Sequence, residues 1–86
     1  MAASPSQQRI NQVKRRELQK LAKQYHGVYE KFRAFGVYEG ISWSATYETI
    51  RASNGEVALI PVFGINGKRF RNEGSFEHCL HKAKTA

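Results

Sequence analysis

The spacing of apolar residues changes at Gly36, and this change restricts the folds that the chain can adopt. Up to Gly36 many apolar residues recur every three or four positions, which is the spacing of one face of a helix. From Ile41 to Thr49 apolar and polar residues alternate, which is typical of a half-buried strand. The sequence therefore predicts an α+β domain in which a helical part precedes a sheet.

The helical part is expected to be one long basic helix over residues 6–35. Strong helix formers fill residues 6–25, with no Gly or Pro among them. Its apolar face consists of residues three or four positions apart: Leu18, Leu21, Ala22, Tyr25, Val28, Tyr29 and Phe32. Gly27 leaves open a break into two helices near His26, and Gly36 is a natural terminator.

Three strands are predicted after this helix, over residues 41–53, 56–65 and 68–72. The dipeptides Asn54–Gly55 and Asn66–Gly67 separate them, and Asn-Gly strongly favours a two-residue hairpin turn. Pro61 lies inside the second strand and predicts a bulge or a local break, because proline has no backbone N–H to donate. Two hairpins in succession give a three-stranded antiparallel meander.

A second helix is predicted over residues 75–85. Ser75 is a suitable N-cap, and Glu77 favours the start of a helix through the helix dipole. Its apolar stripe has helical spacing and consists of Phe76, Cys79, Leu80 and Ala83. The element order is therefore α-β-β-β-α. Both helices are expected to pack on one face of the sheet, since their apolar stripes need a surface to cover.

The length of 86 residues allows a single small domain. Residues 1–5 are expected to form a short frayed tail, and residues 6–86 form the domain. The sequence Gly-Val-Tyr-Glu occurs twice, at residues 27–30 and 36–39. We interpret this echo as chance, because four residues are too few for a structural repeat unit.

Positive charge is concentrated in the first 35 residues. The chain has 14 Lys and Arg against seven Asp and Glu, which gives a net charge of +7. Residues 1–35 hold eight basic and two acidic side chains, a net charge of +6, so residues 36–86 carry only +1. Such a surplus on so small a domain predicts a polyanionic partner.

Two groups of cations are the candidate nucleic-acid-binding residues. The first group lies on the long helix and comprises Arg9, Lys14, Arg15, Arg16, Lys20 and Lys23. Four of its members, at spacings of seven, four and three, share one side of the helix. Such a row of cations fits backbone phosphates without sequence preference. The second group lies at the second hairpin and comprises Lys68, Arg69 and Arg71.

Catalytic and metal chemistry are not indicated by the sequence. There is no aspartate and the glutamates are scattered, so no acid–base pair is proposed. Cys79 falls on an apolar stripe, where a buried, unreactive thiol is expected. We interpret His78 and His81 as exposed helix residues rather than metal ligands, and we expect no cofactor.

Neither a membrane span nor a secretion signal is indicated. The longest apolar run, Val57–Phe63, is far shorter than the roughly 20 residues that a spanning helix needs. The N-terminus lacks the apolar segment of a secretory signal. We therefore expect an intracellular protein, cytoplasmic or nuclear, that does not act at a membrane.

The order α-β-β-β-α resembles the double-stranded-RNA-binding domain, and local sequence agrees with that family over about residues 17–86. The agreeing segments are Leu18–Gln24, Tyr47–Glu48 leading to Asn54–Gly55, Val62–Phe70, and Glu73–Ser75 followed by Cys79 and Ala83. In that family the last helix begins with lysines and a His-containing loop joins the first two strands. This chain has Phe76–His78 and a tight turn at those positions. The resemblance therefore implies that the first helix and the Lys68–Arg71 hairpin would make most contacts to structured RNA.

A second resemblance, to the AP2-type DNA-binding domain, rests on Gly40–Trp43, Asn66–Arg69, and Phe76–Cys79 with Ala83. That family has three strands backed by a helix. The resemblance implies that a polar strand face contacts DNA; this face would consist of Ser42, Ser44 and Thr46 with Arg69 and Arg71.

Two functions are thus predicted from different classes. The favoured one is a small non-enzymatic nucleic-acid-binding module that contacts backbone phosphates, with structured RNA favoured over DNA. The alternative is a protein-interaction module, such as an inhibitor, an adaptor or a dimerising subunit, built on a degenerate version of the same fold. Tyr38, Trp43 and Tyr47 support the alternative if they form an exposed patch, but their alternation equally fits the core side of the sheet.

Overall fold

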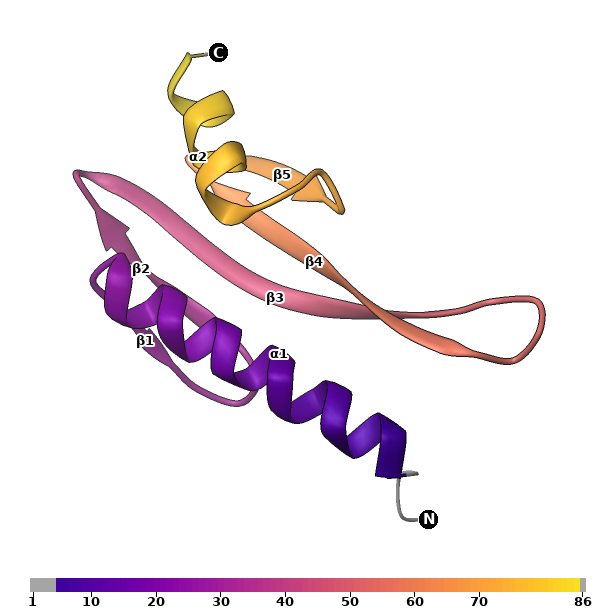
Figure 1. Cartoon of the computed structure of the whole chain (residues 1–86). Coiled ribbons are helices and arrows are strands. Elements are labelled where there is room, and N and C mark those ends of the chain that lie inside the picture. The colour runs from indigo at the N-terminus through magenta and orange to yellow at the C-terminus, as the bar shows by residue number, and fades with distance from the viewer. Residues whose placement is uncertain (1–4, 86) are drawn as a thin grey trace.

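Two helices cover one face of a five-stranded antiparallel sheet (Figure 1). The computed structural model describes residues 5–85, with side chains for residues 10–85. The elements are α1 (Pro5–Gln24), β1 (Gly27–Tyr29), β2 (Ala34–Tyr38), β3 (Ile41–Arg51), β4 (Val57–Ile65), β5 (Lys68–Arg71) and α2 (Phe76–Thr85). The strands follow one another across the sheet in chain order, with β1 and β5 at its edges. The predicted α+β class and meander are confirmed, with two additional strands.

The first helix ends at Gln24, so the prediction of a helix to about residue 35 is wrong. Residues 27–38 form the β1–β2 hairpin instead, in which Gly27 lies opposite Gly36. The two copies of Gly-Val-Tyr-Glu therefore begin on neighbouring strands. Valines and aromatic residues dominate this segment, and these residue types pack well on a pleated sheet. The hairpin also departs from the element order that both family resemblances imply.

Close contacts explain both glycines of this hairpin, because Trp43 lies against Gly27 and the Gly27 backbone lies against Gly36. A Cβ atom on Gly27 would lie 2.4 Å from the Phe35 carbonyl oxygen and 2.6 Å from the Trp43 ring, and one on Gly36 would lie 2.5 Å from the Gly27 Cα. The Trp43 indole Nε1 donates a hydrogen bond of 3.0 Å to the Tyr25 carbonyl oxygen, which fixes the ring over the hairpin. This contact comes from β3, so the residues of the hairpin alone do not reveal it.

Two-residue turns connect two pairs of strands. The predicted Asn66–Gly67 turn between β4 and β5 is confirmed, because both residues have positive φ, 54° and 80°. Glu39–Gly40 makes the same kind of turn between β2 and β3, with φ of 51° and 78°. No turn is predicted there from the sequence, because Glu-Gly is not a typical pair for this turn.

The β3–β4 connection is wider than predicted. Only Gly55 has a positive φ, 87°, and Asn54 does not, so the expected two-residue turn is wrong. The backbone N–H of Ala52 donates to the Glu56 carbonyl, and the N–H of Gly55 donates to the Ala52 carbonyl. The Asn54 side-chain oxygen accepts the Glu56 N–H at 3.0 Å. This pattern is a three-residue loop in which glycine takes the left-handed position.

Pro61 produces no bulge, contrary to the prediction. It pairs in continuous register with Tyr47 of β3. Its carbonyl oxygen accepts the Asn72 N–H at 2.8 Å, on the side of β5. Because N–H and C=O of one residue point to the same neighbour in an antiparallel ladder, the missing donor also falls on that side, beyond the end of β5. The ladder between β3 and β4 is therefore unaffected.

The core lies between the helices and the sheet. Its buried residues are Leu18 and Ala22 of α1, Tyr25 in the turn after α1, Ala34, Trp43, Ala45, Phe63, Ile65 and Phe70 of the sheet, and Phe76, Cys79, Leu80 and Ala83 of α2. The predicted α2 stripe is thus confirmed. Ser75 is its N-cap, since its hydroxyl accepts the His78 N–H at 3.1 Å. The predicted frayed tail at residues 1–5 lies, apart from Pro5, outside the described residues.

The molecule is a thin slab with a projecting hairpin. Its principal extents are 41 × 25 × 16 Å, and its radius of gyration of 13.8 Å exceeds the roughly 12 Å expected for a compact chain of this length. The outer half of the β3–β4 hairpin causes the excess, because β2 pairs only as far as Ala45 and β5 only as far as Val62 (Figure 1).

Candidate nucleic-acid interface

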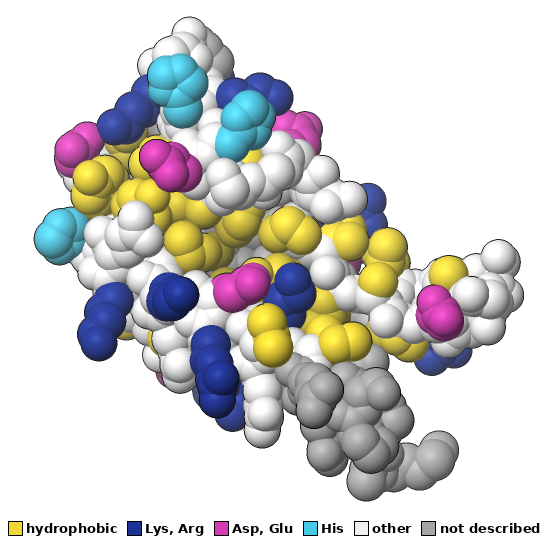
Figure 2. Space-filling model, in the orientation of Figure 1, with side chains coloured by type: hydrophobic (Ala, Val, Ile, Leu, Met, Phe, Trp, Pro, Cys, Tyr) yellow, Lys and Arg dark blue, Asp and Glu magenta, His cyan; other side chains and the backbone are white. Residues whose placement is uncertain are grey.

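Three exposed cations lie on the outer face of α1 within residues 10–24, the part of the helix whose side chains are described. Arg16, Lys20 and Lys23 are exposed, and the helical spacing places them opposite the buried Leu18 and Ala22. Within residues 10–85 none of the three forms an ion pair. Basic side chains gather over this helix in Figure 2. We call these three residues the helix surface.

The helix surface borders a groove between α1 and the edge strand β1. This groove has a volume of about 600 Å³, and the same three cations line it together with Gln19, Val28 and Tyr29. From Arg16 to Lys23 the helix rises about 10 Å. The groove can therefore hold a length of polyanion along the helix, with cations on one wall and an amide available for hydrogen bonds.

The other predicted cations of α1 have different surroundings. Lys14 lies 3.8 Å from the Glu17 carboxylate and 5.0 Å from the centre of the Tyr47 ring, so its charge is already partnered. The Tyr47 hydroxyl donates to Glu17, and burial together with this carboxylate raises the pKa of Tyr47. Arg15 is exposed on the flank of the helix. Arg9 lies in α1, and its side chain is outside the described residues.

The two arginines of the second predicted group lie on the opposite side of the sheet, whereas Lys68 pairs with the buried Ile65 and so starts on the helix side of the edge strand. Arg69 pairs with Gly64, and Arg71 pairs with Val62, on the face away from the helices. The Arg71 Nε donates to Glu48 at 2.8 Å, and this hydrogen bond lowers the pKa of Glu48. Lys68 and Arg69 are exposed and form no ion pair within the described part of the chain. The structure therefore does not bring the two predicted groups together.

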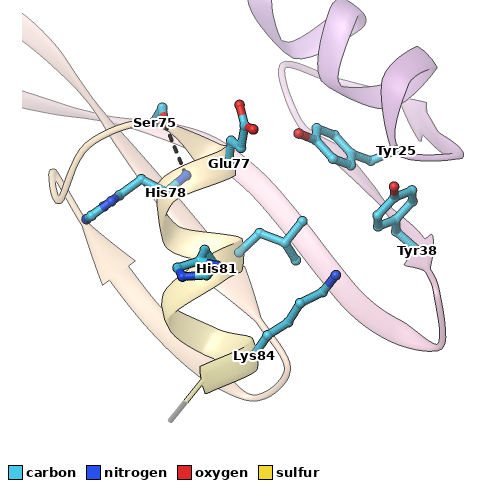
Figure 3. A pocket seen from close by; sticks show the side chains of 8 residues that line it. Tyr25, Tyr38, Ser75, Glu77, His78, His81 and Lys84 are labelled. Carbon is cyan, nitrogen blue, oxygen red and sulfur yellow. Dashed lines mark hydrogen bonds between the residues drawn. The ribbon is translucent and has the colours of Figure 1, made fainter.

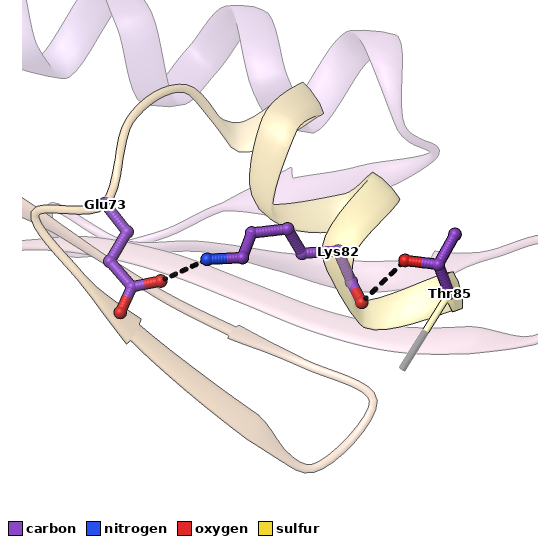
Figure 4. A network of polar contacts seen from close by, with 3 residues as sticks. All are labelled: Glu73, Lys82 and Thr85. Carbon is purple, nitrogen blue, oxygen red and sulfur yellow. Dashed lines mark hydrogen bonds and ion pairs between the residues drawn. The ribbon is translucent and has the colours of Figure 1, made fainter.

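The cations of α2 are neutralised by nearby carboxylates. Lys82 lies 3.3 Å from Glu73, and the Lys82 carbonyl oxygen accepts a hydrogen bond from Thr85 (Figure 4). Lys84 lies 2.9 Å from Glu39, which lowers the pKa of Glu39 and raises that of Lys84. These pairs leave α1, rather than α2, as the cationic helix.

A polar depression of about 570 Å³ separates α2 from Tyr25 and Tyr38 (Figure 3). His78 and His81 lie at its border on α2 and are exposed, as predicted. Across residues 5–85 no three His, Cys, Asp or Glu side chains come close enough to hold a metal ion. We find no nucleophile paired with a general base among the residues that line this depression.

Cys79 is fully buried, with 0% of its surface exposed. Burial raises the pKa of its thiol, and the nearby Glu73 adds to this effect. A buried thiol with a raised pKa is a poor nucleophile.

No helix in the described residues is both long and apolar enough to cross a membrane.

The aromatic residues proposed as an exposed patch belong to the core side of the sheet. Trp43 is only 2% exposed, and Tyr38 and Tyr47 are partly buried against the core.

Arg33 is a candidate binding residue that the sequence does not predict. Its guanidinium lies 5.2 Å from the centre of the Phe35 ring. Alternation along residues 33–37 places the Arg33 side chain on the face of the sheet away from the helices, but this can be inferred only once the segment is known to be a strand.

No protein-family model, curated protein or solved structure matches this chain.

Proposed function

We propose that this protein is a non-enzymatic nucleic-acid-binding module that contacts backbone phosphates, with structured RNA favoured over DNA. One observation carries the proposal: Arg16, Lys20 and Lys23 line one groove of α1 without acidic partners among the described side chains, whereas Lys82 and Lys84 of α2 are paired. Unpaired cations in a row release counterions when they bind phosphates, which drives binding. The preference for RNA comes from the resemblance of Leu18–Gln24 to the double-stranded-RNA-binding domain.

The salt dependence of binding tests the proposal. Binding of labelled duplex RNA, duplex DNA and single-stranded RNA is measured by fluorescence anisotropy over a series of salt concentrations. Each phosphate contact contributes about 0.9 to the slope of log K against log salt for duplex DNA. The double variant Lys20→Gln/Lys23→Gln should therefore lower the slope by up to about 2 and weaken binding.

Lys82→Gln/Lys84→Gln is the matched control, since it removes the same two charges from the last turn of the other helix. Its slope should change much less than that of the α1 variant. An equal loss in both variants would mean that only net charge matters. Absence of binding to all three probes at low salt would reject the proposal.

A protein-interaction module is the second candidate function. The observation in its favour is that Val28 and Val37 on the uncovered face of the sheet are 56% and 59% exposed. Light scattering without nucleic acid tests self-association directly. A stable dimer that Val37→Ser disrupts, together with no RNA binding, would favour this candidate over the first.

A further inference from the structure

The face of the sheet opposite the helices carries a second cationic surface. Strand residues alternate between the two faces, so Ser44 of β3 and Gly64 of β4, which are direct partners, both lie on this face. Neither α1 nor α2 packs against it (Figure 1). Because these two residues are small, the sheet is hollowed here. A Cβ on Gly64 would already approach the Ser44 hydroxyl to 3.0 Å.

Two shallow depressions, of about 470 and 380 Å³, share Ser44, Gly64 and Gly67 and so form one continuous trough. Arg33 lines one end of it, and Lys68 and Arg69 line the other end. The trough therefore crosses the sheet from β2 to the turn before β5, with Ser44 and Gly64 at its centre, the apolar side chains Phe35, Val37 and Val62 along it, and cations at its two ends. We call it the sheet trough.

Charge decides what the sheet trough can accept. Arg33, Lys68 and Arg69 form no ion pair among the described residues, while the carboxylate of Glu48 on the same face is held by Arg71. A second copy of this face would bring arginines against arginines. A phosphate backbone supplies the complementary charge.

The helix surface and the sheet trough cannot hold the same straight duplex, because they face opposite ways on a slab 16 Å thick. A duplex is stiff on this scale, since the persistence length of duplex DNA is about 50 nm. At physiological salt the Debye length is about 8 Å, so the two sets of cations act almost independently. Building on the proposed nucleic-acid binding, we propose that this protein bridges two duplex segments, one on each face.

A capture experiment with the whole chain tests bridging. One duplex RNA is fixed to beads, a second labelled duplex RNA is free, and protein-dependent retention of the label is measured. Capture should rise with protein concentration and then fall in excess, because each duplex then carries its own protein molecules. The variant Arg33→Gln/Arg69→Gln should lower capture at least about tenfold at about 0.1 M salt, because two phosphate contacts are lost.

Variants of equal charge separate the contributions of the two faces. Lys20→Gln/Lys23→Gln removes two of the three cations of the helix surface and should lower capture to a similar degree. In each of these two variants, binding of one duplex in free solution should fall much less than capture, since the other face remains. Lys82→Gln/Lys84→Gln should still capture. Unchanged fluorescence of Trp43, the single tryptophan, confirms that each variant is folded.

Two results would overturn the bridging proposal alone, and a third would also overturn the proposed nucleic-acid binding. If Arg33→Gln/Arg69→Gln captures as well as the unaltered protein, the trough is not a nucleic-acid site and the bridge arises from association of protein copies. If the protein binds one duplex but captures no second duplex, bridging fails while the proposed function stands. If it binds no duplex at all, both fail.

Discussion

The substitution Gly27→Ala distinguishes the observed hairpin from the helix that the local sequence predicts, because the two structures predict changes of opposite sign in the free energy of unfolding. In the interior of a helix, alanine is about 1 kcal/mol more favourable than glycine, so the variant would be more stable. In β1 the new Cβ would lie 2.4 Å from the Phe35 carbonyl oxygen and 2.6 Å from the Trp43 ring. Ordinary contacts of this kind exceed 3.4 Å, so about 1 Å of movement is required.

The Trp43 ring cannot supply that movement cheaply. It packs edge-on against Tyr25 and Phe76, with centroid distances of 6.2 and 5.0 Å, and donates a hydrogen bond to the Tyr25 carbonyl. Overpacking of this kind costs about 1–3 kcal/mol of stability, occasionally more. Because one of the two contacts is with backbone, which moves less easily than a side chain, we expect Gly27→Ala to lower the free energy of unfolding by about 3 kcal/mol. A chain of this size has a total stability of roughly 4–13 kcal/mol, so the loss is a large fraction of it.

Urea unfolding followed by the fluorescence of Trp43 measures this change directly. Gly67→Ala is the control, since its Cβ would meet nothing within 4 Å but its φ of 80° is unfavourable for alanine. We expect a cost of about 1–2 kcal/mol there. A Gly27→Ala variant as stable as the unaltered protein would refute the close approach of Trp43 and the hairpin with it.

Two further predictions concern titration and reactivity. Burial and Glu17 raise the pKa of Tyr47 above its ordinary value of 10.0, so as the pH rises the unfolded chain loses this proton before the folded protein does. The free energy of unfolding should therefore fall above about pH 10. Urea unfolding should show a smaller fall for the variant Tyr47→Phe, which has no such proton. An identical pH dependence in both proteins would contradict the Tyr47–Glu17 contact. Because Cys79 is fully buried, a thiol reagent should label the native protein only at the rate of its opening, and rapid labelling without denaturant would show that α2 does not cover this thiol.

Most elements with strong local signals were predictable from the sequence. The alternation from Ile41 predicted β3, the Asn66–Gly67 pair predicted the turn before β5, and Ser75 with its apolar stripe predicted α2. In each case the information lies within a few residues of the feature. The cations of α1 were also predictable as one helical side, because α1 is regular over the whole segment that carries them.

Residues 25–38 were not predictable because their pattern fits two structures. The spacing of Tyr25, Val28, Tyr29 and Phe32 continues the helical face, yet the segment pairs as two strands. The deciding contact is the Trp43 ring against Gly27, which comes from a residue 16 positions after this glycine. A local periodicity carries no information about such a partner.

By itself, the sequence determined the fold class, the meander of the last three strands and the concentration of positive charge in α1. Only the tertiary structure decided that Arg69 lies on the opposite face of the sheet from Arg16, Lys20 and Lys23. The physical reason is that the direction of a strand side chain depends on its register with its neighbours, whereas net charge depends only on composition. The two cationic groups that the sequence predicts are, in the fold, parts of two different surfaces.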